Sequence, residues 1–250
     1  MRYAGIDIGS RSIELVIIEN GKVTHTRQAD TGFDPVKSSK NLINGADYDV
    51  IIATGYGRNL FEISFDGETV TEIKAHAKGA GYLFPDATTV LDIGGQDSKA
   101  IHMKPSGRVL KFEMNDRCAA GTGKFLEIMA VSLGFTIEEF GNAALKPENL
   151  LEINSMCTVF AESEVTSLVA RGYDRKEIAK GLHHSIVKRA ASMINRVSKG
   201  NKIVFTGGVA NNPCMVHLLE EILNKPIQVP ESPQMTGALG AALIAQEKTK

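Results

Sequence analysis

Two cysteines in similar surroundings are the residues of this chain whose type and position most clearly point to chemistry. Cys118 is followed by small residues and then by apolar residues at helical spacing, among them Phe125, Met129 and Val131. The segment around Cys157 also has the pattern of a cap followed by a helix. A thiol at a helix N-terminus faces unpaired backbone N–H groups and the positive end of the helix dipole, so its thiolate form is favoured. The sequence therefore predicts two thiols, each at the start of a helix.

A carboxylate followed by a glycine turn occurs twice in the chain. Asp7 ends an apolar strand and is followed by Ile-Gly, a polar turn and a returning strand. Asp92, 85 positions later (92 minus 7), stands in the same arrangement. Such a turn can close around a phosphate, although one copy alone is equally consistent with an ordinary hairpin. Two copies in phase predict a duplicated fold that holds a phosphate between two lobes, with both aspartates facing Mg²⁺.

A third glycine turn is suited to a nucleoside. The apolar strand over residues 202–206 runs into Gly207 and Gly208, and backbone at such a turn can approach a flat ligand closely. The helix expected over residues 236–245 consists mostly of small residues, which suits tight packing where two lobes meet.

The other expected elements frame these motifs. Asn20-Gly21 is typical of a hairpin turn, and Pro85-Asp86 is expected to end a helix over residues 70–83 and to act as a hinge. A long core helix is expected from Asp174 to Gly200. The adjacent histidines at positions 183 and 184 lie on it and cannot share a face, so we expect one packed and one exposed side chain rather than a metal pair.

Composition limits the class of protein. The chain has 250 residues, 43% of them hydrophobic, which suits one large domain or two lobes. A net charge of −1 gives no reason to expect a nucleic-acid or anionic-membrane partner, and no run approaches the length of a membrane span. The start of the chain lacks a signal-peptide pattern, and three widely spaced cysteines argue against a disulfide framework. We therefore expect a cytoplasmic protein.

In this order, Asp-Ile-Gly-Ser, Asp-Ile-Gly-Gly-Gln-Asp, Thr-Gly-Gly-Val-Ala and Gly-Ala-Leu-Gly-Ala-Ala resemble the actin, hexokinase and Hsp70-type ATPases. The two cysteine stretches narrow the resemblance. Asn-Asp-Arg-Cys-Ala-Ala-Gly-Thr-Gly-Lys-Phe-Leu-Glu and Cys-Thr-Val-Phe-Ala-Glu-Ser-Glu-Val look like the activator ATPases of 2-hydroxyacyl-CoA dehydratases and the ATPase subunits of benzoyl-CoA reductases (BadF/BadG/BcrA/BcrD type). The resemblance covers nearly the whole chain.

The resemblance implies a duplicated, two-lobe α/β fold of the actin/hexokinase/Hsp70 (ribonuclease H-like) kind. Residues 1–86 would form the first lobe, completed by a C-terminal helix over 235–250, and residues 87–234 the second lobe with the cluster ligands and the adenosine site. Asp7 and Asp92 would organise Mg²⁺, while Gln96 and Asp97 would place the attacking water. The remaining ATP or ADP contacts would be Gly9, Ser10, Arg11, Ser12, Gly94, Gly95, Gln96, Thr206, Gly207, Gly208, Val209, Gln234 and Gly237.

The resemblance also implies a homodimer bridged by one [4Fe-4S] cluster, with ATP hydrolysis driving a low-potential electron onto an iron–sulfur dehydratase or reductase. An electron donor such as ferredoxin or flavodoxin would reload the cluster. A cubane cluster needs four thiolates, so two copies of the chain would each supply Cys118 and Cys157. Cys214 matches no ligand motif and is interpreted as structural. For either ligand cysteine alone, the competing interpretation is a small buried hydrophobic residue.

One position departs from the family pattern. Many members carry a lysine in the first phosphate turn where this chain has Glu14. An acidic residue beside phosphates is unfavourable, so we expect Arg11 to supply the missing charge and Glu14 to turn away.

Two functions of other classes compete with the electron-transfer ATPase. A small-molecule kinase of the same superfamily would turn over ATP only with a phosphoryl acceptor and would contain no iron. A nucleotide-gated scaffold would have structural cysteines or four shared cysteines around Zn²⁺, and would be colourless. Metal analysis separates these hypotheses.

Overall fold

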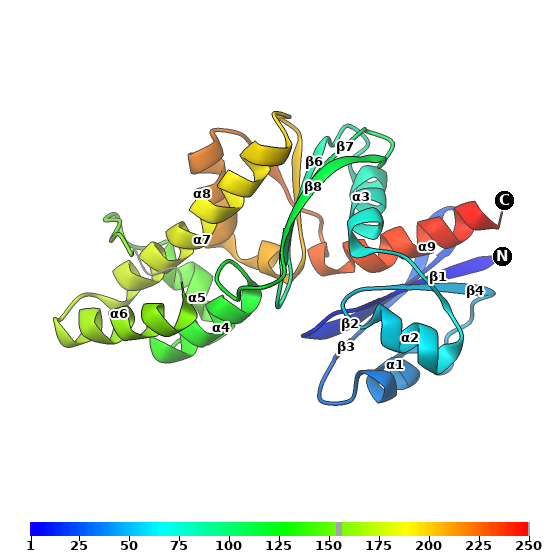
Figure 1. The fold of residues 1–250 in the computed structure, drawn as a ribbon, viewed down its shortest axis with the longest axis horizontal. Helices are drawn as coiled ribbons and strands as arrows, with labels where there is room; N and C mark the ends of the chain where they lie inside the picture. Colours follow the sequence, from blue (N-terminus) through cyan, green and yellow to red (C-terminus); the bar gives the residue numbers. More distant parts are fainter. Residues whose placement is uncertain (154–156, 250) are drawn as a thin grey trace.

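The computed structural model describes residues 1–153 and 157–249, and contains two five-stranded mixed sheets of the same topology (Figure 1). The first sheet has the order β3-β2-β1-β4-β5 and the second the order β10-β9-β6-β7-β8. In each, an antiparallel three-stranded meander is extended by two parallel strands. The strands are β1 (Arg2–Ile8), β2 (Ser12–Glu19), β3 (Lys22–Asp30), β4 (Val50–Thr54), β5 (Glu68–Thr69), β6 (Thr89–Ile93), β7 (Ser98–Met103), β8 (Val109–Asn115), β9 (Ile203–Thr206) and β10 (Ile227–Gln228).

The central strands are mostly apolar, as suits sheets that are covered on both faces. Strands β1 and β2 are buried along nearly their whole length, as expected for strands packed on two sides. Helices α1 (Pro35–Ile43) and α2 (Arg58–Phe65) cover one face of the first sheet. The turn between β2 and β3 has positive φ at both Asn20 and Gly21, so the predicted two-residue hairpin is confirmed.

The last helix of each half packs across the junction. Helix α3 (Glu72–Leu83) lies on the second sheet, while α9 (Thr236–Lys248) lies on the first sheet, and the two helices contact each other between the sheets (Figure 1). Their backbones come so close that a Cβ at Gly240 would stand 1.8 Å from the Ala75 carbonyl oxygen. The small residues expected at this junction are therefore required there. The division into lobes at residue 86 stays a prediction.

The opposite face of the second sheet carries a thick layer of helices, which holds the largest core cluster. These are α4 (Gly123–Ser132), α5 (Ile137–Ala144), α6 (Thr158–Ala170), α7 (Arg175–Val197) and α8 (Pro213–Leu223). The Asp174 side chain accepts a hydrogen bond from the Lys176 N–H, so the predicted N-cap of the long helix is confirmed. Val131 was expected on the packed face of α4 but is 77% exposed. The other apolar residues expected on that face, Phe125, Leu126, Met129 and Leu133, are buried in the core.

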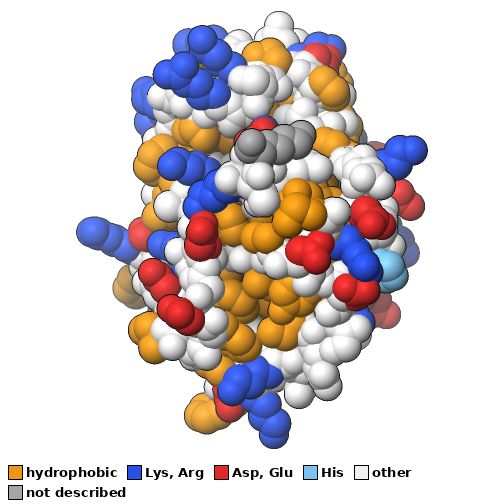
Figure 2. Space-filling view, turned by 90° about the vertical axis from the view of Figure 1, so that its right-hand side faces the viewer, with side chains coloured by type: hydrophobic (Ala, Val, Ile, Leu, Met, Phe, Trp, Pro, Cys, Tyr) orange, Lys and Arg blue, Asp and Glu red, His pale blue; other side chains and the backbone are white. Residues whose placement is uncertain are grey.

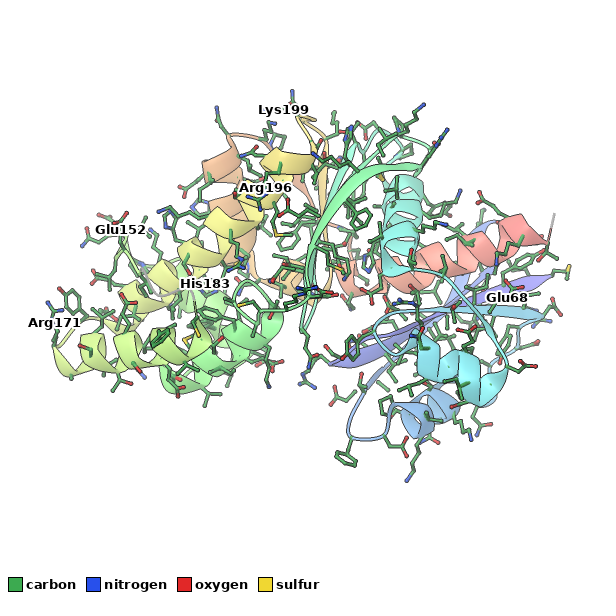
Figure 3. All side chains as sticks on the ribbon, viewed as in Figure 1. Glu68, Glu152, Arg171, His183, Arg196 and Lys199 are labelled. Atoms are coloured by element: carbon green, nitrogen blue, oxygen red, sulfur yellow. The ribbon has the colours of Figure 1, made fainter. Side chains whose placement is uncertain are left out.

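The histidine pair on α7 has a structural role at its buried member. His183 is fully buried among the helices (Figure 3), where its ring meets the Ala179 carbonyl at 2.7 Å and the Asn212 amide at 2.9 Å. Burial lowers the pKa of His183 to about 4, so the ring is neutral. The expected packed histidine is therefore found, whereas His184 is half-buried and not exposed.

The surface carries charges of both signs. On the face in Figure 2, the end of the molecule near both termini, Lys and Arg gather at one upper edge, while elsewhere acidic, basic and apolar side chains alternate. Within the described residues, no helix is long and apolar enough to cross a bilayer.

Candidate functional site

A cavity of about 480 Å³ lies between the two glycine turns. Most of the residues predicted to bind nucleotide line it: Asp7, Gly9, Ser10, Arg11, Ser12, Asp92, Gly94, Gly95, Gln96, Asp97, Gly207, Gly208, Val209 and Gln234. A second cavity of about 850 Å³ also borders these turns, and it shares with the first the residues Gly9, Ser10, Tyr56, Glu72, Gln96, Asp97 and Lys99.

The two aspartates occupy equivalent positions in the duplicated fold. Asp7 pairs in register with Thr54 on the neighbouring parallel strand, and Asp92 pairs with Thr206 in the same way. Each of those strands is followed by a glycine with positive φ, Gly55 or Gly207, at which a Cβ would stand within 2.7 Å of the aspartate. Glycine is therefore needed at both places, and it lets the two carboxylates face the cavity at the ends of the central strands.

The two glycine turns predicted to bind phosphate also have the same geometry. The Gly9 N–H donates to the Ser12 carbonyl at 3.0 Å, and the Gly94 N–H donates to the Asp97 carbonyl at 3.0 Å. These bonds close each hairpin loop beside its aspartate. The arrangement presents two loops of small residues to one cavity, as a clamp on a polyphosphate requires.

A buried lysine that the sequence did not bring to attention joins the acidic groups. Lys99 on β7 is 2% exposed and stands directly opposite Asp92 across the strand pair. Its ammonium lies 2.5 Å from Glu72, 3.2 Å from Asp92 and 2.7 Å from Asp97. Burial alone would lower the pKa of Lys99, but these carboxylates outweigh burial and raise it, so the side chain stays charged. The available signal was a lysine seven positions after Asp92 (99 minus 92), at the start of the returning strand.

His76 on α3 is the second cavity residue that the sequence analysis did not identify. It lies between the two aspartates. Its Nδ1 lies 3.3 Å from Asp92 Oδ1 and 3.2 Å from Thr206 Oγ1, and its Nε2 lies 3.7 Å from Asp7 Oδ2. Burial alone would lower the pKa of His76, but Asp92 and Asp7 raise it to about 9. The resulting imidazolium and Lys99 in turn hold the pKa of Asp92 below its ordinary value, against the effect of burial. No local pattern in the sequence links position 76 to either aspartate.

The expectation for the first turn was wrong at Glu14 and incomplete at Arg11. Glu14 does not turn away: it is 4% exposed and lines the cavity, because it lies directly opposite Asp7 on β2. Arg11 lines the cavity too, but its guanidinium pairs with Asp30 at 3.1 Å and with Glu127 at 3.2 Å. Its charge is thus shared with two carboxylates.

The turn predicted to hold the nucleoside also borders the cavity, with two corrections to its residues. Gly207, Gly208 and Val209 line it, and α5 contributes a wall that the sequence did not indicate. Thr206 does not line the cavity; its hydroxyl donates to Asp92 Oδ1 at 3.1 Å. Gly237 also lies outside the lining, and a Cβ there would stand 2.0 Å from Asp7 Oδ2. Thr206 on β9 contacts Asp92, and Gly237 on α9 lies against Asp7, so both residues support the aspartates from the side away from the cavity.

Cys118 lies in a turn rather than at a helix start. Helix α4 begins at Gly123 after the N-cap Thr122, so Cys118 lies five positions before the first helical residue (123 minus 118). The Asn115 amide donates to the Cys118 carbonyl at 2.9 Å and to the Ala120 carbonyl at 3.2 Å. These bonds shape the turn and leave the cysteine half-buried.

Cys157 is the N-cap of α6, as predicted, and is exposed. All three cysteines are free thiols. Cys214 is buried on α8, and burial raises its pKa to about 12, which agrees with a structural residue. Within residues 1–153 and 157–249, no group of three or more His, Cys, Asp or Glu is placed to hold a metal ion alone.

Comparison with known proteins decides the family. The model of the BadF/BadG/BcrA/BcrD ATPase family matches residues 4–245. The chain belongs to the BadF/BadG/BcrA/BcrD ATPase family. Within that family, the activator of lactoyl-CoA dehydratase from Anaerotignum propionicum is 41% identical over 256 residues, covering 99% of this chain and 98% of that protein. The resemblance stated from the sequence motifs is confirmed.

Solved structures of family members confirm the fold. The (R)-2-hydroxyglutaryl-CoA dehydratase component A from Acidaminococcus fermentans superposes with a TM-score of 0.92, at 38% identity, covering 99% of this chain and 98% of that one. The activator of 2-hydroxyisocaproyl-CoA dehydratase from Clostridium difficile, solved with bound ADPNP, has a TM-score of 0.91, at 37% identity, covering 99% and 95%. This family member therefore has the predicted two-lobe actin/hexokinase/Hsp70-like fold.

Proposed function

We propose that this protein is an ATP-hydrolysing activator that passes a low-potential electron from a [4Fe-4S] cluster to a partner dehydratase or reductase. The observation that carries the proposal is a direct link between the Gly94 turn and the start of α4, the helix that follows the Cys118 turn. The Gly123 N–H donates to the Gly94 carbonyl at 2.9 Å, and the Lys124 N–H donates to the Gly95 carbonyl at 2.8 Å. The names of the relatives, which are dehydratase activators, support it.

MgATP would occupy the cavity between the turns. The loops at Gly9–Ser12 and Gly94–Asp97 would hold its phosphates, and the Gly207 turn with Gln234 would hold the adenosine. A bound Mg²⁺ supplies charge neutralisation, and Asp7 and Asp92 are the oxygen donors placed to hold it, directly or through water. Gln96 and Asp97 would position the attacking water, because phosphoryl transfer depends mainly on positioning and electrostatic stabilisation. Residues 1–86 with α9 would form one lobe and residues 87–234 the other.

The thiols present fit a cluster shared by two chains. One chain offers two free thiols outside the core, half of the four that a cubane requires. The helices that follow Cys118 and Cys157 pack together, and Val159 and Phe160 beside Cys157 are more than two-thirds exposed. An exposed apolar patch is typical of a surface that another chain covers. The homodimer would therefore use this face, and a bound cluster supplies one-electron transfer, reloaded by ferredoxin or flavodoxin.

The decisive experiment is an anaerobic visible and EPR spectrum with iron and sulfide analysis on wild type, Cys118→Ala and Cys214→Ala. We expect about four irons per dimer in wild type and in Cys214→Ala, and none retained in Cys118→Ala. A colourless dimeric wild type that hydrolyses ATP without iron would contradict the proposal. Zinc in that protein would support the scaffold, and hydrolysis that requires an acceptor would support a kinase.

A salt bridge between the first glycine turn and α4 would make the position of α4 depend on whether ATP or ADP is bound. Arg11 in that turn binds Glu127 on α4, and a phosphate in the cavity would compete with Glu127 for the guanidinium. Hydrolysis changes the charge in the cavity, so it would change the strength of the Arg11–Glu127 ion pair. The position of α4, and of the Cys118 turn that precedes it, would change as a result. A nucleotide can drive this change only by binding the two states differently.

The Glu127→Gln variant tests this route. We expect the difference in Cys118 alkylation rate between the ADP and ADPNP complexes of cluster-free protein to shrink by roughly two- to fivefold, the range for a partly exposed ion pair. Glu148→Gln, the same charge change on an exposed side chain, is the control. If Glu127→Gln responds to the two nucleotides as wild type does, the salt bridge does not carry the signal.

A further inference from the structure

The chain segment that carries Cys118 begins and ends beside the same glycine turn. Asn115, the last residue of β8, lies opposite Ser98, which directly follows that turn at the start of β7. At the other end of the segment, the Gly123 N–H donates to the Gly94 carbonyl at 2.9 Å. Strand pairing therefore holds one end of the segment beside the turn, and a backbone hydrogen bond holds the other.

The Asn115 side chain fixes the backbone inside this segment. Its amide nitrogen donates to the Cys118 carbonyl at 2.9 Å and to the Ala120 carbonyl at 3.2 Å. The carbonyl between them, on Ala119, accepts from the Thr122 N–H at 3.0 Å and from the Thr122 hydroxyl at 2.6 Å. Three successive carbonyls are thus hydrogen-bonded, and two of them depend on one side chain.

An amide suits position 115, whereas a carboxylate does not. The nitrogen of an asparagine side chain carries two N–H donors, and both are directed at carbonyl oxygens, which can only accept. A carboxylate of the same shape has no donor and would face two carbonyl oxygens. Removal of the amide takes this partner from both carbonyls and returns conformational freedom to the segment.

The segment that leads to Cys157 has a different support. A Cβ at Gly181 on α7 would stand 2.3 Å from the Leu151 carbonyl oxygen, so that part of the chain packs directly on the long helix. The two free thiols outside the core therefore belong to different parts of the second half. Cys118 lies in a segment bonded to the Gly94 turn, and Cys157 follows a segment that packs on α7.

We propose that Asn115 is the positioning residue that makes the Cys118 turn follow the Gly94 turn when the bound nucleotide changes, so that Cys118 shifts relative to Cys157. The inference rests on the proposed function, because the Gly94 turn responds only if it holds the phosphates of a nucleotide. A segment closed by Asn115 moves as one unit with the strand end and the helix start that flank it. Without the amide, rotation about backbone bonds inside the segment would absorb the displacement of its ends, and Cys118 would not follow.

The test measures the alkylation rates of Cys118 and Cys157 by peptide mass spectrometry in full-length, cluster-free protein, first without nucleotide and then with ADP or ADPNP bound. In wild type, the Cys118 rate should differ between the two complexes. In Asn115→Asp, the nucleotide-free rate at Cys118 should rise roughly 5- to 30-fold, the factor for one or two lost hydrogen bonds, and the difference between the complexes should disappear. Asn115→Ala gives the same test if Asn115→Asp does not fold. The Cys157 rate and the affinity for ADPNP should stay at their wild-type values, because Asn115 does not line the cavity.

Asn201→Asp, the same substitution on an exposed residue between α7 and β9, is the matched control and should behave as wild type does. A Cys118 rate that rises equally in both complexes, with the nucleotide difference kept, would show a purely structural role for Asn115 and overturn the inference. Asn115 variants that react as wild type does would also overturn it. Wild-type rates that are equal with ADP and ADPNP would overturn it too, without touching the proposed nucleotide and cluster sites. Absence of ADPNP binding would instead overturn the proposed function, and the inference with it.

Discussion

Replacing Lys99 by methionine is expected to lower the free energy of unfolding by about 3–5 kcal/mol, the cost of removing one partner from a buried ion pair. The side chain is almost completely buried, and three carboxylates depend on its charge. Methionine fills a similar volume but takes the ammonium away from Glu72 and Asp97 and leaves Asp92 with His76. Urea unfolding of the nucleotide-free protein, with anaerobic handling, measures the loss.

The control for this prediction is Lys202→Met. Lys202 pairs with Asp86 at 3.1 Å, but both side chains are more than half exposed, so its removal should cost less than about 1 kcal/mol. If Lys99→Met unfolds at the same denaturant concentration as this control, the carboxylates do not need Lys99 for their compensation. In that case bound protons, rather than the Lys99 ammonium, would neutralise the three carboxylates.

Replacing Asp7 by asparagine is expected to reduce kcat for ATP hydrolysis by about 100- to 1,000-fold, because loss of metal-assisted charge stabilisation amounts to several kcal/mol. Asparagine keeps the shape of the side chain and its contacts with the Gly55 turn and Gly237, so the fold should be preserved. Steady-state hydrolysis at saturating MgATP measures kcat. Separate calorimetry of nucleotide binding shows whether affinity changes less than turnover.

Asp47→Asn serves as the comparison for Asp7→Asn, because it makes the same chemical change at an exposed ion pair with Arg2, remote from the cavity lining. Its kcat should stay at the wild-type value. An Asp7→Asn protein that hydrolyses ATP within about threefold of wild type would remove Asp7 from the proposed catalytic group.

Much of the candidate site could be predicted because its components are local. A strand that ends in Asp-Ile-Gly and returns after a short turn needs only neighbouring residues to form, so Asp7 and Asp92 and their turns were found from the sequence. The repeat of that pattern also indicated the duplication. The Cys118 helix was misplaced by one turn of chain because hydrogen bonds from Asn115 and to the Gly94 turn decide where α4 begins.

The sequence by itself determined the duplicated architecture, the two carboxylates and the small residues at the α3–α9 junction, because periodicity and turn chemistry act over a few residues. The family was found from the resemblance of its motifs to those of known proteins. Only the tertiary structure decided the electrostatics of the cavity. His76 meets Thr206 across 130 positions of chain, Lys99 gathers carboxylates from two halves of the molecule, and Glu14 faces inward because Asp7 lies opposite it. The charge state of a buried group depends on whatever the fold brings around it, and no local pattern contains that information.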